Sequence, residues 1–440
     1  GSVSTGYDVA NSLKVESDNN EYLERSTSGA SDGSSTQHTI SVWVKRTELG
    51  VDSEPVSAGG IGRFRFESDD TFSYQFRSGK ELITTRLFRD TAAWYHIVAA
   101  ADSSQATASN RMKVYVNGVQ VTDFGTAVYQ DQNQGSPAWG KNTTYSLRVG
   151  AAASSTRNFN GYIAEMYYID GQTLDPTSFG EFDDNGIWIP KAFSGTHGSL
   201  DTYLDFSDAS NLGKNSGGTT DLTANNISAA DQATDTCTNN FCTFNPLMTQ
   251  NNPPTISEGA TKSTGGGGTW NQTWGSIGVK NGKWYYEFKV TNTSSTGYFG
   301  ASTTPAEGSS TSANTLMYNT SFMLGQASRI DYYYWQNGSQ VSNESTGWGT
   351  ISTNDIIGIA LDLDSSTKKF IVYKNGSALN GSGTDLPTNM QDEFIFPLYV
   401  QYENRADEAN FGGYTISSIS SGASDGNGYG TFEYAPPSGY

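Results

Sequence analysis

The sequence has few cysteines, few histidines and few positive charges. Two cysteines and three histidines in 440 residues are too few for zinc sites built from repeated cysteine and histidine pairs. Lysine and arginine number 26 against 45 aspartates and glutamates, which gives a formal net charge of -19. Nucleic acids and anionic membranes are bound through basic surfaces, so the sequence argues against both as partners.

Long apolar runs are also missing. No segment approaches the ~18 consecutive apolar residues of a membrane-spanning helix, and residues 1–30 contain no apolar core of a signal peptide. We therefore expect neither membrane insertion nor export by a signal peptide.

The sequence does contain many short alternating segments separated by turns, and almost no amphipathic helical patterns. Strand-like alternation is clear in TISVWVKR (39–46), WYHIVAAA (94–101) and IIGIALDLD (356–364). Asn117-Gly118 and Asn375-Gly376 each separate two such segments, and this dipeptide favours a type I′ hairpin turn. The sequence therefore predicts an all-β chain with two antiparallel β-sandwich domains of jelly-roll type.

Composition places a connector between the two domains. Residues 181–254 are rich in Asp, Asn, Ser and Gly, which assigns residues 1–180 to the first domain and 255–440 to the second. Aromatic residues such as Trp188 and Tyr203 remain in this segment, and their exposure would be unfavourable. We expect an ordered, loop-rich connector.

The only two cysteines, Cys237 and Cys242, lie five residues apart in this connector. They form either a small local disulfide or two ordinary thiols, because the redox compartment is not encoded in the sequence.

Four motifs in the first half carry a family resemblance. They are ISVWVKR (40–46), TAAWYHIVAA (91–100), RMKVYVNGVQV (111–121) and FNGYIAEMYYIDGQ (159–172). With these motifs, in this order, the first half resembles the concanavalin A-like, laminin G-type jelly rolls.

The second half carries a different set of motifs. They are GKWYYEFKV (282–290), TGYFGAS (296–302), DIIGIALDLDSSTKKFIVYKNG (355–376) and FIFPLYVQYENRADEANFGG (394–413), followed by FEYAPPSGY at the end. In this order they resemble a SPRY-type β-sandwich.

The segments between the halves resemble the linker of phage-encoded two-module proteins. They are YIDGQTLDPTSFGEFDDNGIW (168–188), YLDFSDASNLGKNSGG (203–218) and CTFNPL (242–247). Such proteins are tail or structural proteins, so the resemblance implies a location on the virion surface of a tailed phage.

A catalytic pair of carboxylates is not evident. Glycoside hydrolases flank the sugar bond with two carboxyl groups, and the glucanase motif places acidic residues at alternate strand positions, which this sequence lacks. Glu165 and Asp170 are separated by an odd number of residues, which puts them on opposite faces of a strand. Asp362 and Asp364 share a face but stand where a strand ends, as solvated carboxylates do.

The three histidines also lack a nucleophile motif. His96 lies within a predicted core strand, whereas His38 and His197 lie in polar, turn-like segments. We therefore expect no enzymatic activity.

The family resemblance also implies a calcium ion at the rim of a sheet. SDNNEY (17–22) offers oxygen ligands from Asp18, Asn19 and Asn20. The same three residues are equally good turn formers, so both interpretations stay open.

Aromatic residues give the candidate ligand sites. In DYYYWQNGSQ (331–340), strand alternation points Tyr332 and Tyr334 one way and Tyr333 and Trp335 the other, so one pair is core and the other could stack on a sugar. Trp139 and Trp348 lie in turn-like contexts and either meet a ligand or cap the sandwich ends.

The leading expectation is a non-enzymatic virion surface protein, such as a tail fibre or another appendage, that binds a host-surface glycan or receptor or a neighbouring virion protein. The alternatives are a purely structural capsid or fibre decoration protein and, less favoured, a polysaccharide depolymerase. No heptad pattern specifies a coiled coil, so a homo-oligomer would form through the sandwich faces or through parts outside this sequence.

Overall fold

The computed structural model describes most of the chain. It covers residues 6–26, 33–140, 145–153, 156–248, 253–268, 270–303, 321–326, 329–336, 339–344, 347–414, 416, 419–420 and 422–440, with backbone only for 321–326, 329, 340 and 342–344. Two compact units result, Gly1–Asn240 and Phe241–Tyr440. In this part of the chain the only helices are short 3-10 turns, and none could cross a membrane. The predicted all-β fold class is confirmed.

The first unit contains two antiparallel sheets that face each other. The first sheet has the order β10-β9-β8-β3-β13-β1-β18, with β16 paired to β13. Its strands are β1 (Ser12–Val15), β3 (Gln37–Arg46), β8 (Tyr95–Asp102), β9 (Met112–Val116), β10 (Val119–Gln120), β13 (Gly161–Asp170), β16 (Thr202–Leu204) and β18 (Gln232–Ala233).

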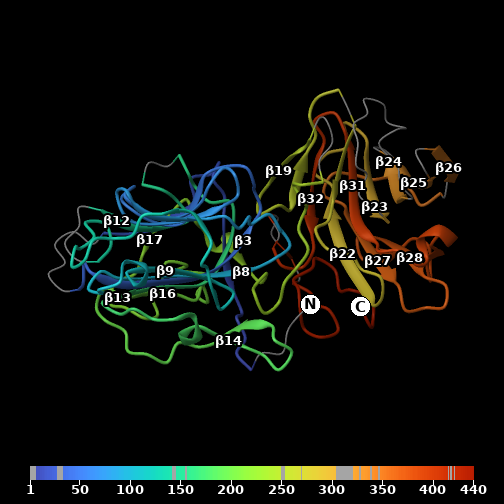
Figure 1. Cartoon of the computed structure of the whole chain (residues 1–440). Helices are drawn as coiled ribbons and strands as arrows, with labels where there is room; N and C mark the ends of the chain where they lie inside the picture. Colours follow the sequence, from blue (N-terminus) through green and yellow to red (C-terminus); the bar gives the residue numbers. More distant parts are fainter. Residues whose placement is uncertain are drawn as a thin grey trace. The chain divides into compact units, whose positions relative to one another are not determined.

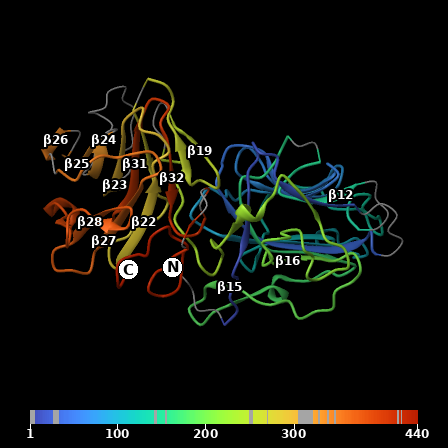
Figure 2. The same cartoon turned by 180° about the vertical axis from the view of Figure 1, so that it is seen from behind.

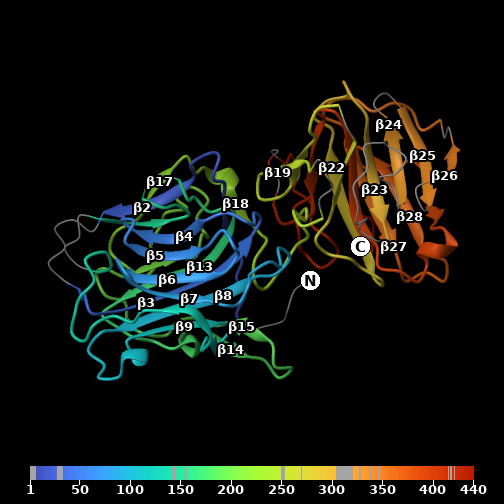
Figure 3. The same ribbon diagram turned by 45° about the horizontal axis from the view of Figure 1, so that its top comes forward.

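The second sheet of this unit has the order β11-β7-β6-β5-β4-β12-β2-β17. Figure 3 shows β4, β5, β6 and β7 side by side. The strands are β2 (Tyr22–Ser26), β4 (Ser53–Ala58), β5 (Gly62–Phe66), β6 (Phe72–Arg77), β7 (Lys80–Thr84), β11 (Phe124–Ala127), β12 (Ser146–Val149) and β17 (Thr223–Asn225).

The core of the first unit lies between these sheets. Alternate residues point inward, so Val42 and Ile97 from the first sheet pack with Phe64 and Tyr74 from the second, all fully buried. Because successive side chains alternate, the remaining residues of the first sheet face outward and need a cover of their own.

This cover comes from residues 171–240, a segment that also adds β16, β17 and β18 to the sheets and Leu204, Phe206, Leu212 and Leu222 to the core. The segment contains the 3-10 turns η2 (Pro176–Ser178) and η3 (Ala229–Asp231) and the hairpin of β14 (Gly180–Phe182) and β15 (Trp188–Pro190). Phe179 and Phe193 pack on Val98 and Tyr167 of the first sheet. In Figures 1 and 2 the green segment with β14 and β15 lies on the side of β16 that faces away from β12. Residues 181–240 of the expected connector are thus part of the first unit.

The second unit also has two antiparallel sheets, of order β19-β20-β32-β22-β27-β28-β29, with β30 on β28, and β21-β31-β23-β24-β25-β26. Figure 3 shows both sets of strands. The strands are β19 (Thr255–Ser257), β20 (Lys262–Thr264), β21 (Trp270–Trp274), β22 (Lys283–Lys289), β23 (Gly297–Ser302), β24 (Ser321–Gln326), β25 (Arg329–Gln336), β26 (Ser339–Glu344), β27 (Ile356–Asp362), β28 (Lys369–Lys374), β29 (Ser377–Ala378), β30 (Thr384–Asp385), β31 (Phe396–Tyr402) and β32 (Ala406–Asn410).

The core of the second unit joins Phe288, Ile359 and Phe370 from its first sheet with Phe299 and Tyr399 from the other. Its C-terminal residues cover the outer face of the first sheet, where Phe432 meets Tyr285 with ring centroids 5.2 Å apart. Each unit therefore covers one sheet with its own chain.

Both predicted Asn-Gly hairpins are confirmed. Asn117 and Gly118 have φ of 47° and 78°, and Asn375 and Gly376 have φ of 48° and 77°, the positive pair that a type I′ turn requires. The amide oxygen Oδ1 of Asn117 accepts a hydrogen bond from the backbone of His96 at 2.8 Å. Asn375 does the same with Ile356, also at 2.8 Å.

Candidate functional site

A pocket of about 360 Å³ lies on the outer face of the first unit, over β8 and β9. Its floor forms because Ala99 and Ala101 face the core, which turns the small side chain of Ala100 outward. Lys113 is paired with Ala100 in the register of β8 and β9. A methyl group thus stands where a larger side chain would fill the hollow.

The chain that follows β13 builds the opposite wall. The hydroxyl of Thr173 donates to the carbonyl of Ala101 at 2.9 Å, and the backbone of Leu174 donates to Oγ1 of Thr39 at 2.9 Å. These bonds carry Asp175 across the sheet to the pocket rim.

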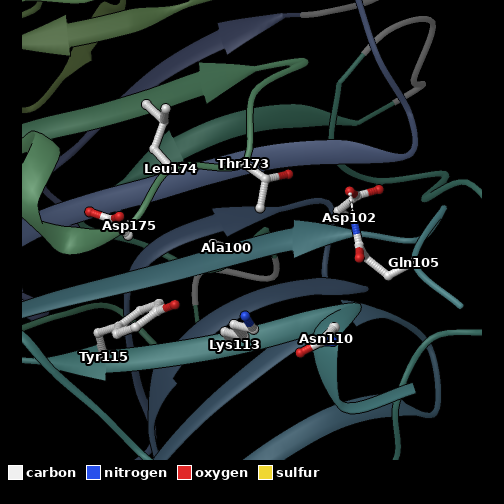
Figure 4. A pocket seen from close by; sticks show the side chains of 9 residues that line it. All are labelled: Ala100, Asp102, Gln105, Asn110, Lys113, Tyr115, Thr173, Leu174 and Asp175. Carbon is white, nitrogen blue, oxygen red and sulfur yellow. Dashed lines mark hydrogen bonds between the residues drawn. The ribbon is translucent and has the colours of Figure 1, made fainter. Parts of the chain in front are cut away.

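Figure 4 shows the polar side chains around the floor: Asp175 and Tyr115 at one end, Asp102 and Gln105 at the other, and Lys113 between them. Lys113 makes no ion pair with any described residue. Its ammonium group is therefore available to a ligand.

The two carboxylates of the pocket differ in the hydrogen bonds that they accept from the protein. Burial opposes ionisation of Asp102, but hydrogen bonds from Ser104 and Gln105 outweigh it and lower the pKa of this carboxyl. Gln105 donates to Oδ2 at 2.6 Å and Ser104 to Oδ1 at 2.6 and 2.9 Å. Asp175 caps η2 with Oδ1, which accepts from the backbone of Thr177 at 2.9 Å.

This arrangement can hold a polar ring-shaped ligand. Tyr115 offers an aromatic side chain, while Asp175, Asn110 and Lys113 offer acceptors and donors of the kind that bind sugar hydroxyls. Burial, followed by the charge of Asp175, raises the pKa of Tyr115 and keeps its hydroxyl protonated. The pKa of Asp102 is lowered, whereas a general acid of glycoside hydrolysis needs a raised pKa.

The predicted aromatic segment is split between two faces, as its alternation predicts. Tyr332 packs against the main core of the second unit, and Tyr333 and Trp335 join Trp274 and Tyr298 in a separate cluster. Tyr333 and Trp335 are only 3% and 7% exposed. Tyr333 and Trp335 are therefore the buried pair, and stacking of Tyr332 and Tyr334, which are half-buried, on a sugar stays a prediction.

Tyr334 is half-buried, and its hydroxyl donates to Oδ1 of Asn389 at 2.7 Å. Trp348 is also half-buried and packs at the edge of the second core, as a capping ring does. Both residues retain some exposure, so their role in ligand binding stays a prediction.

Trp139 corrects the expectation of an exposed tryptophan. It is 1% exposed and belongs to the core of the first unit, and its indole nitrogen donates to the carbonyl of Gln75 at 3.1 Å. A Cβ atom on Gly62 would lie 2.6 Å from its ring. The turn-like sequence around Trp139 gives no sign of this long-range packing.

The candidate calcium residues form a tight turn between β1 and β2. Asn20 has a φ of 52°, its Oδ1 accepts from Asn158 at 3.1 Å, and Asn19 donates to Glu21 at 2.9 Å. No cluster of three His, Cys, Asp or Glu side chains suited to a metal occurs within the described ranges. These contacts are those of turn formers, and calcium at Asp18, Asn19 and Asn20 stays a prediction.

No disulfide joins Cys237 and Cys242, both of which the structure describes. Burial and the nearby charge of Glu165 raise the pKa of the Cys237 thiol in the first unit. Cys242 belongs to the second unit, where its thiol donates to the carbonyl of Thr243 at 3.5 Å. The alternative of two ordinary thiols is the correct one.

His96 and His38 are buried structural residues. His96 stacks on Trp43 with centroids 4.7 Å apart, and its Nδ1 accepts from the indole of Trp188 at 2.9 Å. His38, expected in a polar turn, instead lies buried in β3 with its Nε2 2.6 Å from the hydroxyl of Tyr74. Burial lowers the pKa of each imidazole to about 3, so both rings stay neutral.

The comparisons with known proteins fit this fold. Residues 17–175 match the family described as the Concanavalin A-like lectin/glucanases superfamily, which supports a concanavalin A-like fold for the first unit. Lectins and SPRY domains of these folds are typically binding domains.

Two solved structures are similar to the chain. The SPRY domain of human HERC1 is 16% identical, with a TM-score of 0.29, over 40% of this chain and 99% of that one. The TRIM65 PSpry domain is 17% identical, with a TM-score of 0.28, over 38% of this chain and 88% of that one. At these TM-scores neither similarity carries an argument. No curated protein matches the chain.

Sequence reasoning missed the pocket. Its residues come from β8, β9 and the segment after β13, which lie far apart in the chain. The available signal was Ala100 at an outward position opposite Lys113, with Tyr115 two residues further along β9, which marks a hollow with polar walls on the outward face.

Proposed function

We propose that this chain is a non-catalytic binding protein on the virion surface of a tailed phage and that it contacts a host-surface glycan through the pocket over Ala100. The observation that carries the glycan proposal is the combination of the Tyr115 side chain with an ammonium group, Lys113, that has no ion-pair partner among the described residues. Sugars are held by such aromatic and polar pairs. The family match over residues 17–175 supports a lectin-like role for this unit.

The virion location is supported by a separate observation, the resemblance of the linker segments to those of two-module phage proteins. Mass spectrometry of purified particles tests it, and we expect peptides of this chain in the particle fraction. Peptides found only in the lysate of infected cells would contradict this part of the proposal.

The glycan proposal is tested by glycan-array binding with three variants. Tyr115→Ala and Lys113→Ala should each lower the signal of a specific hit at least tenfold, because each removes a direct ligand contact. Tyr429→Ala, which removes a 38%-exposed tyrosine of the second unit, should leave the signal unchanged. A blank array with folded protein, or equal losses in all three variants, would contradict a glycan site at this pocket.

A neighbouring virion protein is the second candidate partner, because apolar side chains are exposed near β15. Val119, Phe182 and Ile187 are 60%, 52% and 50% exposed, and Phe182 packs edge-on against Trp188 at 4.9 Å. Single exposed apolar residues are ordinary, but several around one ring suggest an interface. Loss of particle assembly in Phe182→Ser, with array binding intact, would favour this architectural role.

A further inference from the structure

The second unit contains a built-in counterpart of the pocket. The two Asn-Gly hairpins can be matched residue by residue, because Asn117 and Asn375 each accept a hydrogen bond at 2.8 Å from a backbone N–H of the neighbouring strand, that of His96 in β8 and that of Ile356 in β27. Four residues before each asparagine stand Lys113 and Ile371. Their strand partners are Ala100 and Ala360, so the same small residue forms the floor in both units.

The flanking positions match as well. Tyr115 corresponds to Tyr373, two residues before each asparagine. Asp102 corresponds to Asp362, two residues beyond each alanine, and hydrogen bonds from the turn that follows lower the pKa of both carboxyls despite burial. The two hollows therefore share a floor, an aromatic wall and an acidic end.

In the second unit this place is filled. The side chain of Tyr440 packs with Ala360 and Ile371, next to Tyr373, and is 9% exposed. A six-membered ring thus fits over the alanine floor when the chain supplies one. In the first unit the corresponding place is the pocket of about 360 Å³.

The difference between the two hollows lies in polarity. Ile371 suits the apolar ring of tyrosine, whereas Lys113 in its place, with Asp175 on the rim, suits a ring that carries hydroxyl groups. The pocket lining contains two carboxylates and one ammonium group, on a chain of net charge -19. An anionic ligand would be repelled by this excess of negative charge.

We infer that the pocket holds one uncharged sugar ring over Ala100, in the place that the ring of Tyr440 takes in the second unit. This rests on the proposed glycan-binding function and specifies its ligand: a neutral hexopyranose is accepted and its uronic acid counterpart is disfavoured. Asp175 sets that preference by charge, and Ala100 sets the space for the ring.

Isothermal titration calorimetry of the full chain tests the inference with matched probes: methyl glycosides of glucose and galactose, and the corresponding uronates. We expect at least one neutral glycoside to bind. Its uronate should bind at least about fivefold more weakly, the size of effect expected for repulsion between partly exposed charges. Asp175→Asn, which keeps an oxygen to cap η2, should reduce the difference in affinity between the neutral glycoside and its uronate. Asp131→Asn, which removes an exposed carboxylate outside the pocket, should not.

Ala100→Leu should weaken binding of the neutral glycoside at least about tenfold, because the larger side chain occupies the space over the floor. Ala224→Leu, at an exposed position of β17, is the matched control for added apolar volume. Lys113→Ile copies the second unit and should weaken binding without filling the floor, so the test does not depend on one variant that folds poorly. Melting temperatures confirm that each variant is folded.

The outcomes separate this inference from the proposed function. A glycan-array hit with no binding of the four glycosides, uronates that bind as tightly as their neutral partners, or Ala100→Leu with unchanged affinity would each overturn the inference alone. If the array shows no binding and calorimetry detects no binding of any of the four glycosides, both the inference and the proposed function are overturned.

Discussion

The two units cover an outer sheet face in the same way but leave different surfaces. In the first unit Trp188 of the cover lies against Gly118, where a Cβ atom would come within 2.3 Å of the ring. In the second unit Tyr434 lies against Gly376, where a Cβ atom would come within 2.5 Å. Each cover thus packs onto the glycine of an Asn-Gly turn, which has room because glycine carries no side chain.

A buried glutamate also holds each cover, although on different strands. Glu165 on β13 accepts hydrogen bonds from the hydroxyls of Tyr7, Tyr167 and Tyr203 at 2.9–3.2 Å. Glu287 on β22 accepts from the backbone of Glu433 at 2.8 Å and of Tyr434 at 3.0 Å. Burial raises the pKa of both carboxyls.

The two surfaces differ over β8 and β9 in the first unit and over β27 and β28 in the second. Tyr440 fills the second hollow, whereas the first cover passes at Thr173–Asp175 and leaves the pocket open. The first unit therefore keeps an open pocket because its cover stops short of the alanine floor.

The largest expected effect comes from the turn glycines. Gly118→Ala and Gly376→Ala should each destabilise their own unit by about 4 kcal/mol, because a left-handed backbone and a ring clash add together. Gly79 also has a positive φ, 72°, but a Cβ atom there would meet nothing within 4 Å. Gly79→Ala should therefore lower the free energy of unfolding by only about 1 kcal/mol. Denaturant unfolding measures all three, and equal losses would show that the covers do not depend on these contacts.

A pH-dependent effect should appear in the first unit. Burial raises the pKa of Glu54 to about 7, against the lowering effect of Arg65, Arg63 and Arg157, and neither carboxyl oxygen has a hydrogen-bond partner. Because the folded chain binds this proton more tightly than the unfolded chain, the contribution to stability is complete below about pH 4.5 and is lost as the pH rises to 7. Over this pH range the free energy of unfolding should fall by about 3 kcal/mol.

Glu54→Gln should flatten this slope in the first unit and leave unfolding of the second unit unchanged. Urea unfolding at several pH values, followed by fluorescence, measures both. An unchanged slope in the variant would assign the pH dependence to other groups, such as Asp170, whose pKa is raised to about 6 by burial.

The cover glutamates should have a smaller effect. Glu165→Ala and Glu287→Ala should each cost about 2 kcal/mol, because buried donors lose their acceptor. Hydrogen exchange should then accelerate in the cover of the altered unit only. Acceleration across both units in either variant would contradict two independent covers.

The turn asparagines should have the smallest effect. Asn117→Gly and Asn375→Gly keep the positive φ but remove one side-chain hydrogen bond each, for about 1 kcal/mol. Thermal unfolding of both variants should give similar shifts, since the two bonds have equal lengths. Clearly unequal shifts would break the residue-by-residue match of the hairpins.

The sequence predicts the local features well and the long-range ones poorly. Asn117-Gly118 and the alternation of Tyr332 to Trp335 depend on neighbouring residues, and the structure confirms both. The burial of Trp139 depends on Gly62 and His38, far away in the chain. The pocket depends on the segment after β13, which brings Asp175 to its rim, so it cannot be found from Lys113 and Tyr115 alone.

The central claim is that the first unit, and not the second, holds the ligand site. Backbone amide chemical shifts of the 15N-labelled, deuterated chain test it most directly during titration with the neutral glycoside that binds. We predict shifts at Ala100, Lys113, Tyr115 and Asp175, with Ala360, Ile371 and Tyr373 unmoved. Shifts confined to residues 330–336 or to Trp348 would contradict the account and return the site to the aromatic segment of the second unit.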